Sequence, residues 1–347
     1  MAAEPGSARI YTLADSTYFV GLVALLNSLY VTGNRYELVV LDCGLDERQR
    51  ARVGEHATIV PLPPEAARRN VLAKPYVHRL TTPSELVVWI DSDVIVTGRL
   101  DPILASAARG RVCVFPVDWP EQRTRSCAEW SRLFSLTAPI RPQVYANAGF
   151  CALSPRHWPT LLDRWSQLCS CIPDGVTFRG DIASNPLWAG DQDALNALLM
   201  SEIPDGAVHL LPETEAVFPP DMERVDVLDL GQLACAIDGG AVTMLHYSWV
   251  PKPWAPRAWR RMQRPLRDAY ARILPRVLFG DDVPLVLEPK DVPPWLRSGA
   301  LGATARGGVA IARPLRRLGA RAAGRLPARA QRRLVAIRDG LEPTRRG

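Results

Sequence analysis

Two carboxylates with the spacing of a metal site stand at positions 91 and 93. The triplet Asp91-Ser92-Asp93 directly follows the apolar run 85–90 (ELVVWI). Carboxylate oxygens suit hard cations such as Mn²⁺ and Mg²⁺. A turn at the end of a strand would let both side chains reach one ion. A solvated loop pair, or a cap for a following helix, is the alternative interpretation.

A histidine and a lysine far along the chain carry complementary groups. His246 ends the run VTMLH, and Lys252 stands six residues later. A neutral imidazole binds Mn²⁺ and would complete a set of two carboxylates and one nitrogen. A core histidine bonded to a backbone carbonyl is the alternative. Only three of the 42 basic residues are lysine, so a lysine here favours a compact ammonium group for a phosphate.

The segments that must position these residues alternate between the two kinds of regular structure. The spacing of apolar residues predicts strands over 9–14, 36–42, 57–62, 85–90, 111–117, 145–153 and 242–246, and helices over 18–31, 46–56, 64–80 with an interruption at Pro75, 157–171 and 191–202. This alternation predicts an α/β fold with a mainly parallel sheet and helices on both faces. Ligands of such sheets bind beyond the carboxyl ends of the strands, where Asp15 and the 91–93 triplet stand.

Composition and charge limit the class of protein. The chain has 347 residues, 47% hydrophobic and 22% charged, as in globular proteins. The net charge of +6 comes from residues 297–347, which hold 13 arginines and two acidic residues. The high pI therefore says little about the substrate of the rest. The apolar stretch 19–31 is too short to span a bilayer, so a core helix is expected. The N-terminus shows no secretory signal, and the seven cysteines are expected to be free thiols.

Five segments in order resemble glycosyltransferase family 8, which includes bacterial lipopolysaccharide galactosyltransferases and glycogenin. They are 11–18 (YTLADSTY), 86–96 (LVVWIDSDVIV), 145–150 (YANAGF), 190–196 (GDQDALN) and 246–254 (HYSWVPKPW). The resemblance covers about 9–256 and implies a GT-A fold, a Rossmann-like α/β/α sandwich. Because the stretch from 288 is rich in proline and charge, we expect the catalytic domain to span 1–287. The resemblance also implies Mn²⁺-dependent (or Mg²⁺-dependent) transfer of glucose or galactose from a UDP-sugar to a saccharide or lipid-linked acceptor, with retention of configuration.

The resemblance implies roles at the matching positions. The metal ligands would be Asp91, Asp93 and His246. The nucleotide would contact Ala14, Asp15, Tyr18, Lys74, Ser92 and Lys252. The donor sugar would contact Arg79, Asn147, Asp191 and Gln192, with Asp191 and Gln192 as the catalytic pair and Gln192 nearest the anomeric carbon.

Each of these roles has a structural alternative. Asn147 would shape a turn, Asp191 would cap a helix, and Tyr18 would be a core aromatic. Trp249 departs from the family, which often has glycine at this position, and this puts the contacts to the diphosphate in question.

Retention by double displacement needs a nucleophile opposite the leaving group. Gln192 is a poor nucleophile, so a front-face mechanism is expected, in which the leaving phosphate assists the incoming hydroxyl. Two other classes stay open. A metal-dependent sugar-phosphate nucleotidyltransferase usually has a glycine-rich loop after its first strand, which TLADSTYF lacks. A non-catalytic nucleotide-sugar-binding protein would not need the intact metal set.

Residues 288–347 are predicted to be a linker and an arginine-rich tail. The stretch 313–338 mixes arginine with apolar residues and suits an amphipathic helix on an anionic membrane surface, with a solvated tail as the alternative. The tail has no interleaved aromatic residues, so nucleic acid is not an expected partner. We expect a cytoplasmic protein with peripheral contact to the inner face of the cell membrane, and acceptor loops within 118–143 and 173–188.

Overall fold

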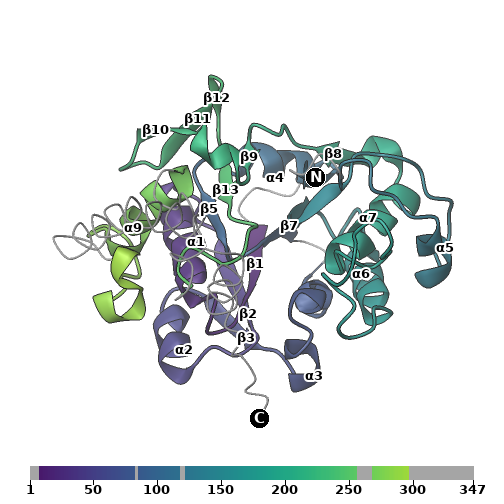
Figure 1. Ribbon diagram of the computed structural model, residues 1–347, viewed down its shortest axis with the longest axis horizontal. Helices are drawn as coiled ribbons and strands as arrows, with labels where there is room; N and C mark the ends of the chain where they lie inside the picture. Colours follow the sequence, from purple (N-terminus) through teal and green to yellow (C-terminus); the bar gives the residue numbers. More distant parts are fainter. Residues whose placement is uncertain (1–7, 83–84, 118–121, 256–267, 297–347) are drawn as a thin grey trace, which may run out of the picture. The chain divides into compact units, whose positions relative to one another are not determined.

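The computed structural model describes residues 8–82, 85–117, 122–255 and 268–296 (Figure 1). The chain divides into two compact units, Met1–Val292 and Pro293–Gly347. The predicted amphipathic stretch 313–338 lies outside the described residues. No helix among those described is long and apolar enough to cross a membrane.

A seven-stranded sheet in the order β3-β2-β1-β4-β7-β6-β8 forms the centre of the first unit. Its strands are β1 (Ala8–Ala14), β2 (Glu37–Asp42), β3 (Thr58–Pro61), β4 (Leu86–Ile90), β6 (Val112–Pro116), β7 (Ala146–Leu153) and β8 (Val208–Leu210). Strands β3, β2, β1 and β4 are parallel neighbours, and β8 runs parallel to β6. Only β7 is antiparallel to its neighbours β4 and β6. The prediction of a mainly parallel sheet is confirmed.

Helices cover both faces of this sheet, as predicted. In Figure 1, α1, α2 and α9 lie to one side of the strands and α6 and α7 to the other. The α-helices are α1 (Phe19–Val31), α2 (Glu47–Gly54), α3 (Pro64–Ala67), α4 (Asp101–Ala108), α5 (Glu129–Leu133), α6 (Leu161–Ser170), α7 (Asp191–Ser201) and α9 (Ala269–Phe279). Short 3₁₀ helices are η2 (Asn70–Arg79), η4 (Asp205–Ala207), η5 (Asp221–Glu223), η6 (Pro289–Asp291) and η7 (Pro294–Leu296).

The stretch 64–80 differs from its prediction in where the helix is interrupted. The break falls between α3 and η2, and Pro75 lies inside η2. Short 3₁₀ turns tolerate a proline there because no continuous α-helical ladder needs its missing N–H. Helix α1 is a core helix as expected, with Asn27 bonded to the carbonyls of Val277 and Leu285.

Two small sheets stand beside the large one. One has the order β5-β13-β9, with β5 (Val94–Val96), β13 (Met244–His246) and β9 (Ala216–Val217). The other is β10-β11-β12, with β10 (Asp226–Asp229), β11 (Ala234–Ile237) and β12 (Gly240–Ala241). Strand β13 pairs antiparallel with β5, so that His246 lies opposite Val94. That register brings the histidine beside the aspartate triplet.

Candidate active site

A tight turn follows β4 and carries the two aspartates. The five residues of β4 are all buried, and the strand ends just before Asp91. The N–H of Val94 donates to the carbonyl of Asp91 at 3.1 Å, which closes the turn. The N–H of Asp91 donates to the carbonyl of Gly149 on β7 at 2.8 Å. The turn is therefore anchored to the sheet on one side and to β5 on the other.

His246 completes a cluster with both carboxylates. Its Nε2 lies 3.1 Å from Asp93 Oδ1 and 4.0 Å from Asp91 Oδ2. One ligand atom from each of the three side chains lies within 4.8 Å of the other two. The back of the imidazole packs against Phe218, with ring centroids 5.2 Å apart. The structure thus brings together the three residues that the sequence predicts as a metal site.

The cluster fits a divalent cation. Asp93 Oδ1 is buried and accepts no hydrogen bond in good geometry from the described residues. A buried carboxylate oxygen without a donor is costly, and a cation held by two carboxylates and an imidazole would satisfy it. Gly149 leaves room for the ring, because a Cβ there would meet His246 Cε1 at 2.2 Å.

Two buried lysines balance the charge of the carboxylates. Lys252 Nζ donates to Asp93 Oδ2 at 2.5 Å and to the carbonyl of Tyr247 at 2.7 Å. Burial alone would raise the pKa of Asp93, but Lys252 and then His246 hold it well below its ordinary value. Lys74 Nζ lies 2.9 Å from Asp91 Oδ1 and 3.0 Å from Asp191 Oδ2.

Lys74 joins the turn after β4 to the start of α7. Burial alone would lower the pKa of Lys74, but the carboxylates of Asp191 and Asp91 raise it above its ordinary value. In turn, burial raises the pKa of Asp191 to about 6, against the lowering effect of Lys74. Asp191 is the first residue of α7. Its carboxylate faces the lysine.

Gln192 and Asn147 line the same cavity as this ion pair. Gln192 Oε1 accepts from the N–H of Ala148 at 3.0 Å, which orients its amide. Asn147 Oδ1 accepts from the N–H of Gly149 at 2.7 Å. This hydrogen bond to Gly149 shapes the backbone of β7, and the side chain of Asn147 also lines the cavity.

Asp15 and Tyr18 stand at the carboxyl end of β1. Asp15 Oδ1 accepts from the N–H of Thr17 at 2.8 Å and from the N–H of Tyr18 at 3.1 Å, so it shapes the turn into α1. The ring of Tyr18 meets Trp254 edge-on, with centroids 6.2 Å apart, and Lys252 Nζ lies 5.7 Å from its centre. Burial raises the pKa of the Tyr18 hydroxyl.

Two adjoining cavities contain these side chains. The larger, which we term the metal-site cavity, has a volume of about 260 Å³. Its walls include Tyr18, Lys74, Asp91, Asp93, Asn147, Asp191, Gln192, His246 and Lys252. A smaller cavity of about 70 Å³ is lined by Ala14, Asp15 and Ser92 and shares Tyr18, Lys74, Asp91 and Asp93 with the larger one.

Arg79 lies apart from both cavities. It is exposed at the end of η2, with its guanidinium 5.1 Å from the centre of the Tyr76 ring. Trp249, where the family often has glycine, is 41% exposed and lines neither cavity. Their predicted relation to the donor therefore stays a prediction.

Several site residues escaped the sequence reasoning. Trp89 Nε1 donates to Asp91 Oδ1 at 2.7 Å and fixes that carboxylate. Its position two residues before Asp91 on a strand, and hence on the same face, is a signal that could have identified it. Gln122, Phe178 and Trp188 also line the metal-site cavity. They belong to the two segments expected to hold acceptor loops, of which 118–121 lie outside the described residues.

No family model matches this sequence, and no curated protein matches it. Solved structures do. The galactosyltransferase LgtC in complex with donor and acceptor sugar analogs is 17% identical, with 79% of this chain and 98% of that chain covered and a TM-score of 0.50. The likeness shows the fold. It is the GT-A fold.

Two further structures have the same fold. An active-site mutant of LgtC is 16% identical, with 76% of this chain and 94% of that chain covered and a TM-score of 0.50. The bifunctional glycosyltransferase WbbM is 15% identical, with a TM-score of 0.51, and the match covers 81% of this chain and 50% of that chain. The GT-A fold that the sequence resemblance implies is thereby confirmed.

Proposed function

We propose that this GT-A chain is a metal-dependent glycosyltransferase that transfers a hexose from a UDP-sugar. The observation that carries the proposal is the cluster of Asp91, Asp93 and His246, whose ligand atoms lie within 4.8 Å of one another in a cavity that also holds two lysines. Two carboxylates, an imidazole and two ammonium groups suit a divalent cation together with a diphosphate. A bound Mn²⁺ or Mg²⁺ would neutralise charge on the departing nucleoside diphosphate.

The arrangement of the cavities supports a direction for the donor. The smaller cavity, with Asp15 and Tyr18, suits the base, because a carboxylate and an aromatic ring offer an acceptor and a stacking surface. Lys252 stands between this end and the metal cluster, where it would hold the diphosphate. Asp191 and Gln192, which line the larger cavity but not the smaller one, would bind hydroxyls of the transferred sugar.

The ion pair of Asp191 favours a front-face reaction with retention. Its carboxylate lies 3.0 Å from Lys74 Nζ, which reduces its strength as a nucleophile. Gln192 is an amide and cannot form a stable glycosyl ester. In the reaction we propose, the bond from the anomeric carbon to the phosphate oxygen breaks, the acceptor oxygen bonds on the same face, and its proton passes to the departing phosphate. Isolation of a glycosyl adduct on Asp191 would overturn this mechanism.

We infer that the acceptor is a saccharide or a lipid-linked saccharide. The likeness to LgtC supports a sugar acceptor, since that protein was crystallised with donor and acceptor sugar analogs. We also propose that the arginine-rich tail contacts the inner face of the cell membrane. Sedimentation with vesicles containing anionic lipid tests this idea. Equal binding to neutral vesicles would contradict it.

A donor panel tests the proposed activity. UDP-glucose, UDP-galactose and other UDP-sugars are incubated with the full chain and Mn²⁺, and released UDP is measured. Slow metal-dependent hydrolysis of one donor is expected, because water can replace the acceptor. If no UDP-sugar reacts while UTP and a sugar 1-phosphate are converted to a UDP-sugar, the chain is a nucleotidyltransferase instead. If neither reacts, the protein is a non-catalytic binding protein.

A further inference from the structure

A further cavity of about 190 Å³, distinct from the two described above, lies beside the metal-site cavity. We term it the second cavity. The two share Val117 in their walls. Phe218 also separates the two cavities. It lines the second cavity and packs against His246, which lines the metal-site cavity, with ring centroids 5.2 Å apart. Strand β9 supplies Val217 to the second cavity and is the parallel neighbour of β13, which carries His246. The two cavities are therefore neighbours on either side of Val117 and Phe218.

One wall of the second cavity is a three-membered ion-pair group. Arg224 donates to Asp238 Oδ2 at 2.6 Å and lies 3.3 Å from Asp221 Oδ1. Asp238 and Gly239 form the two-residue loop of the β11–β12 hairpin, with φ of 50° and 81°. Such positive values at both positions are those of a tight hairpin turn and hold Asp238 in place. The turn thus fixes the backbone at Asp238, while the three side chains of this wall are 55–66% exposed.

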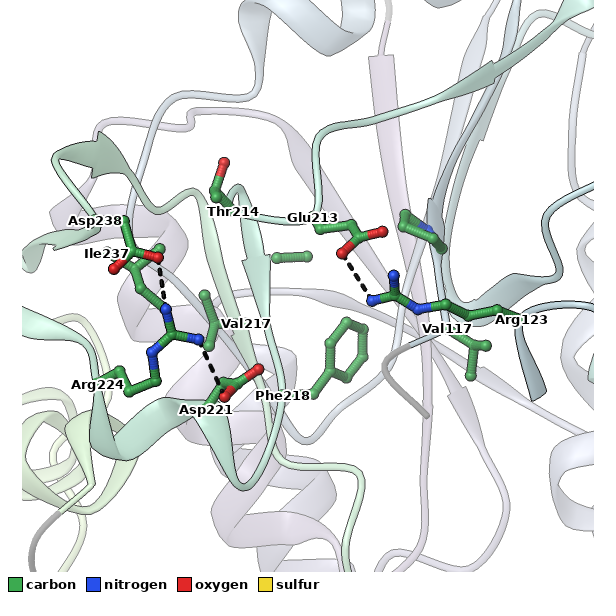
Figure 2. Close-up of a pocket in the computed structure, with 12 residues that line it drawn as sticks. Val117, Arg123, Glu213, Thr214, Val217, Phe218, Asp221, Arg224, Ile237 and Asp238 are labelled. Atoms are coloured by element: carbon green, nitrogen blue, oxygen red, sulfur yellow. Dashed lines mark hydrogen bonds and ion pairs between the residues drawn. The ribbon is translucent and has the colours of Figure 1, made fainter. Parts of the chain in front are cut away.

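The opposite wall carries a second ion pair. Arg123 donates to Glu213 Oε2 at 2.7 Å. Its Nε is buried and has no hydrogen-bond partner among the described residues. Figure 2 shows the two ion-paired groups on opposite sides, with Val217 and Phe218 between them. The cavity thus offers paired donors and acceptors on both flanks and an apolar surface between them.

The charges decide which class of ligand fits. Two guanidinium groups face three carboxylates, so the lining has an excess of one negative charge. A phosphate or another anion would be repelled by the carboxylates. A neutral polyhydroxylated ring can instead donate to carboxylates, accept from guanidinium groups and place an apolar face on an aromatic side chain. A saccharide combines these groups.

We propose that the second cavity binds the sugar unit of the acceptor that is next to the unit receiving the hexose. This inference rests on the proposed glycosyl transfer and adds a subsite to it. The receiving unit lies in the metal-site cavity near Val117, and the neighbouring unit lies between Arg224 and Arg123. The enzyme therefore recognises at least a disaccharide in its acceptor.

Acceptor kinetics with and without the second cavity test this assignment. The acceptor probes are methyl β-galactoside and methyl β-glucoside as single units, and lactose, cellobiose and maltose as disaccharides. The variants are Arg224→Gln, which removes the guanidinium group, and Asp238→Asn, which removes a charge with little change of shape. Arg99→Gln is the matched control, because Arg99 also forms an exposed ion pair, with Asp101 at 2.7 Å, and lines none of the three cavities. UDP-sugar hydrolysis by each variant provides the internal reference.

We expect the wild-type chain to use one disaccharide with a lower KM than either methyl glycoside. Arg224→Gln and Asp238→Asn should raise the disaccharide KM about tenfold, as the loss of one or two hydrogen bonds predicts. Arg99→Gln should leave it unchanged. Inorganic phosphate should not compete with the disaccharide.

Three results would overturn the subsite. One is a disaccharide KM that matches the control in both variants, the second is an equal rise for the methyl glycosides, and the third is competition by phosphate. If the wild-type chain hydrolyses no UDP-sugar, the proposed function fails instead. Saturation-transfer NMR with the same saccharides then tests whether the second cavity binds a saccharide, independently of catalysis. Disaccharide signals that weaken in Arg224→Gln would support it, and the absence of any saccharide signal would exclude it.

Discussion

At the scale of single residues, the ring of His246 lies against the backbone of Gly149. A Cβ on that glycine would meet His246 Cε1 at 2.2 Å and Asn147 Oδ1 at 2.8 Å. We predict that Gly149→Ala displaces the imidazole and weakens Mn²⁺ binding about 10- to 100-fold, the range seen when the surroundings of a metal ligand are disturbed. Isothermal titration with Mn²⁺ measures the affinity.

Gly206→Ala is the control for this change, because a Cβ there meets no atom within 4 Å. It should bind Mn²⁺ as the wild type does. Wild-type affinity in Gly149→Ala would show that the position of the imidazole does not depend on the glycine.

Lys74 is the second residue on which the site depends. Its ammonium group is buried between Asp91 and Asp191. Lys74→Met leaves two carboxylates without their shared partner, so the free energy of unfolding should fall by about 3–5 kcal/mol. Asp191→Asn in the same chain removes one of the orphaned charges and should restore part of the loss. Urea unfolding without metal measures both, and an unchanged midpoint in Lys74→Met would refute the argument.

The metal cluster was predictable at this scale, and its surroundings were less so. Asp91 and Asp93 follow a buried strand, and His246 ends another, so each could be placed from the sequence. Their mutual contact depends on the register of β13 with β5, which pairs only three residues on each strand. Such short strands give almost no periodic signal. The roles proposed for Arg79 and Gln192 came from resemblance, and the structure places Arg79 away from both cavities.

At the scale of the elements, the carboxyl end of β2 is held by Asp42. Its Oδ1 accepts from the N–H groups of Leu45 and Gly44 at 2.7 and 2.8 Å, and Oδ2 pairs with Arg50. Burial alone would raise the pKa of Asp42, but the hydrogen bonds from Arg50, Leu45 and Gly44 lower it. The ionised carboxylate therefore stabilises the loop that follows the strand.

Asp42→Asn should lower the free energy of unfolding by about 1–3 kcal/mol at neutral pH. Because the pKa is lower in the folded state, this stabilisation is present above the unfolded pKa of about 3.9 and is lost as the pH falls through the folded value. The difference in the free energy of unfolding between wild type and variant, measured with urea, should therefore be constant from about pH 7 to 5 and become smaller below about pH 4. A difference that widens on acidification would contradict this explanation.

The order of strands and helices along the chain was predictable because long apolar runs and helical spacing mark β1, β2, β4, α1 and α7. The direction of β7 was not, since an apolar run looks the same in either direction. Its antiparallel placement between β4 and β6 puts Asn147 and Gly149 at the metal cluster. Strands β9 to β12 have two to four residues each and could not be predicted from spacing.

At the scale of the whole molecule, the boundary of the catalytic domain can be tested by truncation. The sequence predicts an end at residue 287, and the first compact unit ends at Val292. Asp291 pairs with Arg48 and Arg52 of α2 at 3.2 and 2.8 Å, and Val292 is buried. Residues 288–292 therefore help to hold α2.

A chain ending at Val292 should unfold at the urea concentration of the full chain. A chain ending at residue 287 should lose about 2–4 kcal/mol, from one buried valine and the three ion pairs that Glu288 and Asp291 form with α2. Equal stability of the two shortened chains would show that the catalytic domain ends at 287, as the sequence predicts.

The central claim is that Asp91, Asp93 and His246 hold the cation on which glycosyl transfer depends. Titration with Mn²⁺, followed by UDP release from the preferred UDP-sugar, tests it in the wild type, in Asp93→Asn and in the control Arg99→Gln. We predict binding and metal-dependent UDP release in the wild type and in Arg99→Gln, and the loss of both in Asp93→Asn, since one of three ligands is removed. Metal-dependent UDP release that persists in Asp93→Asn at the wild-type rate and Mn²⁺ affinity would contradict the claim.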